Sequence, residues 1–307
     1  MPVVERERGF PHGPDGSGPV GAEQGSGVLI WPATRFVAGE DRETAIAAAR
    51  GLNARGIAVS LDLLGENVRE ADEAASASDA YVDLLRGIAE ASVDSNISIK
   101  LTMLGLDIAP RLAEENLRVI LEAAEASGNW VRIDMEGSPY TQLTLEIFQR
   151  VWESHRNVGV VVQSMLRRTA DDVERLIAMG ARVRLVKGAY REPAPLAFQT
   201  KAEVDGAFDR LAERLLDAGN EPAIATHDDA RIRHVLEHAE RHGIPPGRYE
   251  FQMLYGIRPT TQVAMVEHGH RMRVYVPYGE RWLPYFARRL RERRENVTFV
   301  LRNLIRR

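Results

Sequence analysis

The sequence predicts an α/β fold, a single (β/α)8 barrel of the TIM type. Eight short β-rich runs follow one another along the chain, and each is followed by a stretch with helical periodicity. Eight such units over about 250 residues are typical of a closed parallel barrel. The alternative is an open doubly wound sheet, which usually has about five or six strands. Because no linker-like stretch interrupts residues 43–307, we expect one barrel domain over residues 31–307.

The first regular element that follows the N-terminal segment is a helix. Residues 1–27 are rich in Gly and Pro and have no apolar period, so we expect residues 1–30 to form a short flexible tail. Apolar residues then recur at helical spacing over 43–55, and Gly56 stands where a helix commonly ends.

Strands and helices alternate from there to the C-terminus. The clearest of the helices that follow strands cover residues 110–126, 169–178 and 230–242. The eight predicted strands cover residues 57–64, 97–104, 130–136, 158–165, 182–190, 222–228, 249–256 and 271–278.

Composition and charge exclude several classes of protein. The chain has no Cys, which excludes disulfides, thiolate nucleophiles, Cys-bound zinc and iron–sulfur clusters. A net charge of −4 argues against a dedicated nucleic-acid-binding protein, so we expect no nucleic-acid partner. No apolar run approaches the ~20 residues of a membrane span, and the N-terminus lacks the apolar segment of a signal peptide. We therefore expect a cytoplasmic protein.

Polar residues gather at the C-terminal ends of the predicted strands, where barrels of this kind hold their active sites. Three of the cations, Lys100, Arg184 and Lys187, lie inside apolar runs, where an unpaired charge is costly. A mouth with charges of both signs indicates a bound, charged ligand. The polar residues at these ends are Asp62, Glu66, Lys100, Asp134, Glu136, Gln163, Arg184, Lys187, Thr226, His227, Asp228, Gln252, Tyr275 and Tyr278.

Two small residues stand at the end of the fifth predicted strand. Gly188 and Ala189 would let a ligand approach the backbone closely, and either a flat aromatic cofactor or a phosphate would suit them. Thr226 and His227, at the next strand end, could donate hydrogen bonds to the same ligand.

The C-terminal segment is basic. Residues 280–307 hold nine Arg and three Glu, and a helix is predicted to begin at Pro284. Two adjacent Arg and a Tyr on one stripe of that helix would grip a carboxylate, because guanidinium groups bind carboxylates bidentately. A solvated basic face or contact with anionic lipid are the alternatives, so peripheral attachment to the inner face of the cytoplasmic membrane stays open. The stripe comprises Tyr285, Arg288, Arg289 and Glu292.

Two motifs are set aside. The segment from Gly16 to Gly21 has the G-x-G-x-x-G spacing, but no strand precedes it and no helix opens after it. His234, His238 and His242 recur every fourth residue on a helix and could chelate a metal. Without an HExxH pattern or nearby paired carboxylates, an exposed helical face is the better interpretation, and we predict no metal site.

The residues alone leave two further function classes open. Lys187 at a strand end would suit an aldolase or lyase that forms a Schiff base with its substrate. A barrel that binds small anions through the Arg-rich helix, without turnover, is the other class.

The chain resembles the proline dehydrogenase family in its short, monofunctional bacterial form. The resemblance runs from about residue 35 to the C-terminus, and its motifs are specific as an ordered set. It implies a distorted (β/α)8 barrel, FAD as cofactor, oxidation of L-proline to 1-pyrroline-5-carboxylate, and transfer of the electrons to a membrane quinone. The matching segments are LDLLGE (61–66), SIKL (98–101), RIDME (132–136), VQS (162–164), RLVKGAY (184–190), ATHD (225–228), EFQMLYG (250–256), VYVPYG (274–279) and YFARR (285–289).

The resemblance also implies a catalytic centre and a cofactor site. Asp134 and Arg184 match the catalytic centre near the flavin, and we add Glu292 to the residues assigned to the cofactor. The other positions that match FAD-contacting residues are Met135, Gln163, Val186, Lys187, Gly188, Ala189, Thr226 and His227, together with Arg184 itself.

The substrate site is implied in the same way. Arg288 and Arg289 match the pair that holds the proline carboxylate, and Lys100 lies beside the substrate. Glu66 matches a carboxylate that pairs with the first of these arginines and closes the site. The wall around the ring is expected to be Leu254, Tyr275 and Tyr285.

Overall fold

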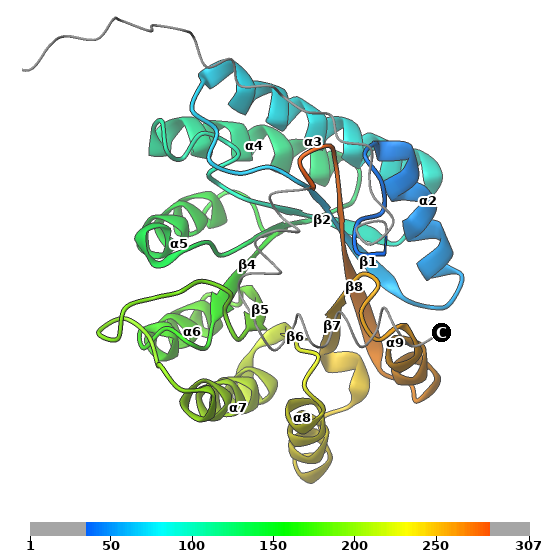
Figure 1. The fold of residues 1–307 in the computed structure, drawn as a ribbon, viewed down its shortest axis with the longest axis vertical. Coiled ribbons are helices and arrows are strands. Elements are labelled where there is room, and N and C mark those ends of the chain that lie inside the picture. The colour runs from blue at the N-terminus through cyan, green and yellow to red at the C-terminus, as the bar shows by residue number, and fades with distance from the viewer. Residues whose placement is uncertain (1–34, 283–307) are drawn as a thin grey trace, which may run out of the picture.

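The computed structural model describes residues 35–282 of the 307, and they form a closed parallel barrel. The strands follow chain order around the barrel, and β8 pairs with β1 to close it (Figure 1). The predicted (β/α)8 fold is confirmed, and the open doubly wound sheet is excluded. The strands are β1 (Ala58–Leu63), β2 (Ser95–Ile99), β3 (Val131–Ile133), β4 (Val158–Gln163), β5 (Arg182–Val186), β6 (Asn220–Ala225), β7 (Glu250–Leu254) and β8 (Arg271–Tyr278).

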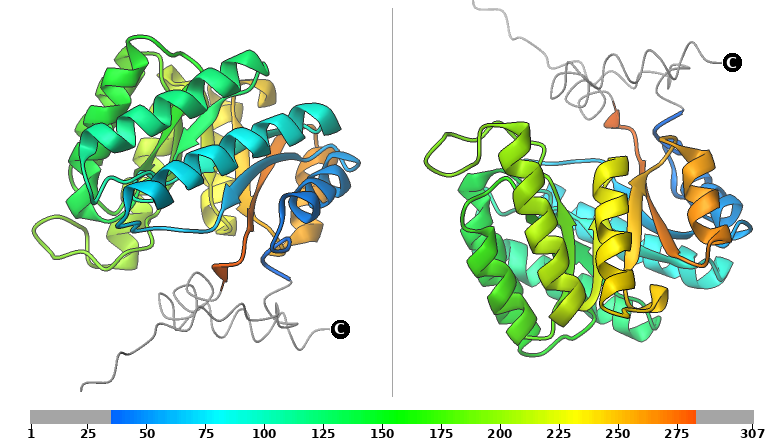
Figure 2. Two further views of the ribbon diagram at one scale, coloured as in Figure 1. Left: turned by 90° about the horizontal axis from the view of Figure 1, so that it is seen from above. Right: turned by 90° about the horizontal axis from the view of Figure 1, so that it is seen from below.

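Helices cover the outside of the strands, as the two further views make clear (Figure 2). In α4 (Pro110–Ala126), for example, the fully buried Leu117, Leu121 and Ala124 lie four and three residues apart, which places them on one helix face. The other helices are α2 (Arg42–Asn53), α3 (Ala71–Ala91), α5 (Ser138–Trp152), α6 (Thr169–Ala178), α7 (Lys201–Ala218), α8 (Asp229–Arg241) and α9 (Pro259–Glu267), with a short 3-10 helix, η1 (Pro246–Arg248), before β7.

Both predictions made for the chain termini fall outside the described residues. These are the flexible tail over residues 1–30 and the helix that begins at Pro284. Among the helices of residues 35–282, none is both long enough and apolar enough to cross a membrane.

Several strands end earlier than predicted. The run 97–104 was expected to be strand throughout, but β2 ends at Ile99. The apolar residues that follow are buried in turns, where the amides of Met103 and Leu104 donate to the carbonyl groups of Lys100 and Leu101. Burial rather than strand pairing therefore explains the length of this apolar run. β3 is shorter still, so Asp134 lies just beyond its end.

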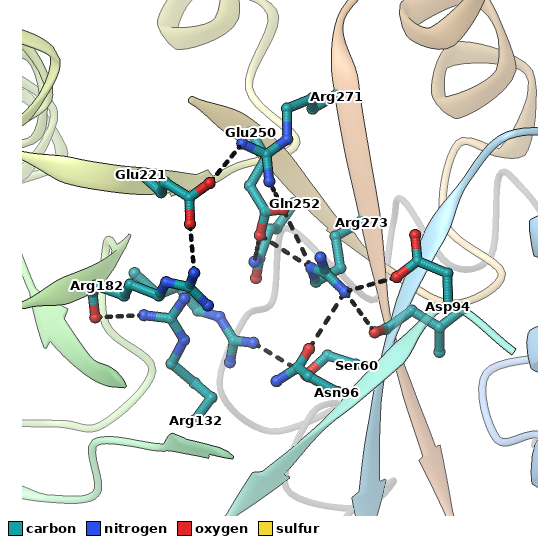
Figure 3. Close-up of polar contacts among 12 residues, drawn as sticks. Ser60, Asp94, Asn96, Arg132, Arg182, Glu221, Glu250, Gln252, Arg271 and Arg273 are labelled. Atoms are coloured by element: carbon teal, nitrogen blue, oxygen red, sulfur yellow. Dashed lines mark hydrogen bonds and ion pairs between the residues drawn. The ribbon is translucent and has the colours of Figure 1, made fainter. Parts of the chain in front are cut away.

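The N-terminal end of the barrel is filled by a network of arginine and glutamate side chains (Figure 3). Glu250 accepts hydrogen bonds from Arg273 Nε at 3.0 and 3.1 Å, and only 7% and 8% of the two side chains are exposed. Arg132 donates to the backbone carbonyl groups of Val160 and Arg182. Burial, with the charges of neighbouring arginines, lowers the pKa of Arg132 well below its usual range. This end of the barrel is therefore a packed floor, and the opposite end is left for a site.

Candidate active site

A buried ion pair stands at the centre of the C-terminal mouth. Arg184 lies on β5 and Asp134 follows β3, with Arg184 Nη1 2.8 Å from Asp134 Oδ1. The Tyr275 hydroxyl of β8 donates to the other oxygen of Asp134 at 2.8 Å. The Tyr275 ring also lies 5.4 Å from the guanidinium carbon of Arg184, within cation–π range. Three residues expected in the site from the resemblance are thus brought together.

The guanidinium of Arg184 is held on a second side by two serines. Its Nη2 lies 3.3 Å from Ser60 Oγ and 3.2 Å from Ser98 Oγ, on β1 and β2. Within residues 35–282, the buried Nε of Arg184 has no hydrogen-bond partner. The group is therefore fixed in position and retains a donor.

Lys100 forms a second buried pair beside the first. Its Nζ lies 2.8 Å from Asp62 Oδ1 and 4.0 Å from Asp134 Oδ2. Burial by itself would lower the pKa of Lys100, but the charges of Asp62 and Asp134 outweigh burial and raise that pKa above its usual value. Lys100 is therefore a cation at neutral pH, next to the catalytic centre that the resemblance predicts.

Lys187 is held by carboxylates rather than left free to react. Its Nζ lies 2.7 Å from Asp228 Oδ2 and also contacts Asp205. Burial would raise the pKa of Asp228, but the hydrogen bond and charge of Lys187 lower it well below the usual range. Two carboxylates hold the Lys187 side chain in ion pairs, whereas a Schiff-base lysine must reach its substrate as a free amine. This geometry does not favour the aldolase or lyase alternative.

The glycine after β5 is required by packing. Gly188 has φ +113°, and a Cβ at this position would lie 2.3 Å from Met165 Sδ. From the sequence, a small residue here is predicted to allow close approach of a ligand. The structure gives a second reason, because Met165 occupies the space above the glycine. Ala189 lies in the long connection between β5 and α7. Glu192 of this connection accepts a hydrogen bond from the Ser138 amide, at the start of α5, at 2.7 Å.

The remaining predicted residues of the site occupy neighbouring strand ends. Gln163 donates to the carbonyl group of Glu136 at 3.0 Å, and the Leu254 amide donates to His227 Nε2 at 2.9 Å. Thr226 directly follows β6 and is buried. The strand ends also place Met135, which is buried, and Val186 and Glu66, which are partly buried. Tyr285, Arg288, Arg289 and Glu292 lie outside the described residues.

One polar group at the mouth, Glu136, has a structural partner. Glu136 accepts from Thr102 Oγ1 at 2.6 Å and from the Thr102 amide at 3.2 Å, and burial raises the pKa of Glu136.

A polar pocket of about 410 Å3 lies at the rim of the mouth rather than over Arg184. The residues that line it are Asn67, Arg69, Asp107, Ile108 and Tyr140.

Sequence reasoning left three residues of this cluster without a role. Asp62 was recognised only as a polar strand end, and Ser60 and Ser98 were not singled out. Each lies two residues from another polar side chain on its strand, as in Ser60 and Asp62, or Ser98 and Lys100. Because alternate strand residues share a face, that spacing was the available signal.

The C-terminal mouth therefore holds two fixed cations, Arg184 and Lys100, each paired with a carboxylate, and this set can orient a polar ligand. The third cation, Lys187, is held one strand end away from Thr226 and His227. Hydrogen-bond donors and charges of this kind orient a small substrate rather than a macromolecule.

Known proteins resemble this chain over most of its length. The family model described as proline dehydrogenase matches residues 45–302. Proline dehydrogenase 1 of Bacillus subtilis subsp. natto is 41% identical, over 89% of this chain and 90% of that protein. Proline dehydrogenase of Deinococcus radiodurans is 38% identical over the same shares.

A solved structure shows the same fold within a larger protein. Proline utilization A of Bdellovibrio bacteriovorus, inactivated by N-propargylglycine, matches with a TM-score of 0.80 and 27% identity. The match covers 86% of this chain but only 33% of that protein. By sequence and by fold, the chain belongs to the proline dehydrogenase family, a family of oxidoreductases of proline metabolism.

Proposed function

We propose that the protein oxidises L-proline to 1-pyrroline-5-carboxylate, with FAD as its cofactor and a membrane quinone as the final electron acceptor. The observation that carries the proposal is the fixed cluster of Arg184, Asp134 and Tyr275 at the mouth of a barrel of this family. We also propose that residues 31–307 act as one catalytic domain.

The donor set at the mouth suits FAD. Arg184 keeps a buried Nε donor without a partner among the described residues, and Lys187 presents a charge fixed by two carboxylates. Such groups favour a cofactor that carries phosphates and gains negative charge on reduction. When bound, FAD supplies the acceptor for two electrons. The residues proposed to hold it are Met135, Gln163, Arg184, Val186, Lys187, Gly188, Ala189, Thr226, His227 and Glu292.

The substrate side of the proposal rests on charge. Arg288 and Arg289 are proposed to bind the proline carboxylate bidentately, with Lys100 beside it. Leu254, Tyr275 and Tyr285 would pack on the ring and keep water away from it. Glu66 would pair with Arg288 and close the site.

Asp134 acts in this proposal as the group that holds two cations in place. It contacts Arg184 at 2.8 Å and lies 4.0 Å from Lys100 Nζ. The orientation of the reacting carbon depends on such fixed groups, because a small displacement of the substrate lowers the reaction rate strongly.

A visible absorbance spectrum tests the function. The purified full-length protein, incubated with FAD, should show a flavin band that bleaches when L-proline is added without oxygen. If the protein takes up no FAD, the proposed cofactor is wrong. If L-proline leaves the flavin band unchanged, the proposed substrate is wrong.

Quinone reduction and membrane contact need separate measurements. The proline-reduced protein should be reoxidised by a soluble quinone analogue, and no reoxidation would overturn that acceptor. For peripheral membrane contact, we expect co-sedimentation with phosphatidylglycerol vesicles that weakens as salt is raised. Absence of binding at low salt would refute the membrane contact alone.

A further inference from the structure

A cluster of histidines and carboxylates lies between the last turns of α7 and α8, away from the proposed active site. These two helices pack side by side (Figure 2). In a (β/α)8 barrel the helices run back toward the N-terminal end of the strands, so their last turns lie opposite the catalytic mouth. Asp217 comes from α7, and His238 and His242 come from α8 and its C-cap.

The three side chains lie close enough to share one ion. His238 Nε2 is 2.7 Å from Asp217 Oδ1, and the rings of His238 and His242 stack with centroids 4.1 Å apart. One ligand atom from each of the three residues lies within 4.8 Å of the others. The predicted exposed face for these histidines is wrong for His238, which is only 5% exposed.

The other ring nitrogens of the two histidines already face oxygen atoms. His242 Nδ1 is 2.9 Å from the carbonyl oxygen of His238, which can only accept, so that nitrogen carries the hydrogen. His238 Nδ1 lies 3.6 Å from Glu213 Oε1. A carbonyl or carboxylate behind the ring is the usual support of a metal-binding histidine, and it leaves Nε2 as the ligand atom.

Spacing and charge point to the class of ion. Histidines four residues apart on a helix are on one face, and a carboxylate from the adjacent helix completes a three-ligand set. Two imidazoles and one carboxylate suit Zn2+, Co2+, Ni2+ or Cu2+ better than Mg2+ or Ca2+, which prefer oxygen. Asp217 and His242 are exposed, so both can move the short distance to metal-ligand bonds of about 2.0–2.1 Å.

We propose that Asp217, His238 and His242 bind a divalent ion of the zinc class and thereby clamp the last turns of α7 and α8 together. Glu213 Oε1, which also contacts His234 Nε2 at 2.9 Å, faces His238 Nδ1 at 3.6 Å, and water fills the remaining coordination position. The ion is structural, because it is bound at the end of the barrel opposite the mouth. This inference does not depend on the proposed oxidation of proline.

The test uses the untagged full-length protein, stripped of metal. Calorimetry measures the binding of Zn2+, and thermal unfolding measures its effect on stability. We expect one Zn2+ per chain and a rise of several degrees in the unfolding midpoint, because a ligand that binds only the folded state stabilises it. Co2+ should give the visible absorbance bands of a low-symmetry site with nitrogen ligands.

Matched variants locate the site. Asp217→Asn and His242→Gln change exposed residues, so both should fold, and each should weaken Zn2+ binding at least tenfold. His268→Gln is the control, because His268 Nδ1 makes the same contact, 2.7 Å to the carbonyl oxygen four residues earlier, but His268 is not part of the cluster. Equal loss in the control, unchanged binding in His242→Gln, or no stoichiometric binding by the wild type would each overturn the proposal.

Discussion

Arg184 and Asp134 form a buried ion pair at the mouth of the barrel, although they stand on different strand ends fifty positions apart in the sequence. Further hydrogen-bonding groups contact each member of the pair. Tyr275 donates to Asp134, and Ser60 and Ser98 contact the guanidinium. Such a pair adds little net stability by itself, but loss of one partner leaves a buried charge uncompensated.

Asp134→Asn should therefore impair catalysis more than Tyr275→Phe. Asparagine keeps the shape but removes the charge that faces Arg184 and Lys100, so the positions of both cations are no longer enforced. We expect kcat/KM for L-proline to fall about 100-fold or more. Phenylalanine at position 275 removes a single hydrogen bond and should cost roughly tenfold. Dye-reduction kinetics normalised to flavin content measure both. A kcat/KM for Asp134→Asn within twofold of the wild type would contradict the assignment.

Asp228 makes stability depend on acid pH. Burial raises its pKa, but Lys187 and the Ala230 amide together lower it, so the net pKa lies below the unfolded value of about 3.9. A lowered pKa gives stability that is present above about pH 4 and is lost as the pH falls through the folded pKa.

Asp228 is the N-cap of α8, where its side chain accepts from the Ala230 amide. The variant Asp228→Asn isolates the charge, because asparagine caps helices as well as aspartate does. We expect it to lose about 1–2 kcal/mol in urea unfolding near pH 7, and to approach the wild type as the pH falls below about 4. Asp229→Asn, an adjacent exposed position, should show a much smaller loss. A gap that stays constant down to pH 3 would refute the charge explanation.

The packed floor should respond unequally to its two charges. Glu250→Gln leaves the buried Arg273 without its close carboxylate partner, so we expect a loss of about 3–5 kcal/mol in the free energy of unfolding. Arg132→Met removes a buried cation whose hydrogen bonds go to backbone carbonyl groups, so it should lose clearly less. Chemical denaturation gives both values. If Arg132→Met lost more free energy of unfolding than Glu250→Gln, then Arg132 would contribute more than Glu250 to the stability of the packed floor.

The fold was predictable because it depends on local patterns. Apolar runs with period two, helical stretches between them and turn residues at their ends are all visible along the chain. The ends of the strands were less predictable. Leu101 and Leu104 are as apolar as strand residues, but they are buried by a turn over β2, and burial alone does not distinguish the two.

The polar residues that gather at the mouth were visible in the sequence, but their pairings were not. An apolar run around Lys100 or Arg184 shows that each cation needs a partner, but it does not identify the partner. Asp62 and Asp134 come from other strands, so only the closed barrel selects them. The His238 prediction failed for a related reason, since its partner Asp217 lies on the preceding helix and was not visible as a paired carboxylate.

Arg289→Met should weaken substrate binding more than it slows turnover. Charge-assisted bonds to a carboxylate are worth about 1.5–3 kcal/mol each, so KM for L-proline should rise roughly 10-fold to 100-fold while the flavin content is kept. Arg291→Met is the matched control, because position 291 lies off the predicted stripe of Tyr285, Arg288 and Arg289. If the two variants raised KM equally, the carboxylate would have to bind elsewhere.

Gly188→Ala separates backbone strain, packing and ligand approach. The φ of +113° is costly for alanine, and its Cβ would also lie 2.3 Å from Met165 Sδ, so we expect a loss of about 2–5 kcal/mol. Gly180→Ala is the control for strain alone, since its φ is +70° and nothing lies within 4 Å of a Cβ there; it should lose about 1 kcal/mol.

The double variant Gly188→Ala with Met165→Ala then distinguishes the two reasons for the glycine. Removal of the methionine side chain relieves the clash, so the double variant should regain FAD binding if packing alone requires glycine. If instead FAD binding stays lost while the folded state is retained, close approach of the cofactor to the backbone requires it as well. Flavin content per folded chain, measured beside the unfolding curve, decides between the two, and full FAD binding by Gly188→Ala itself would contradict both.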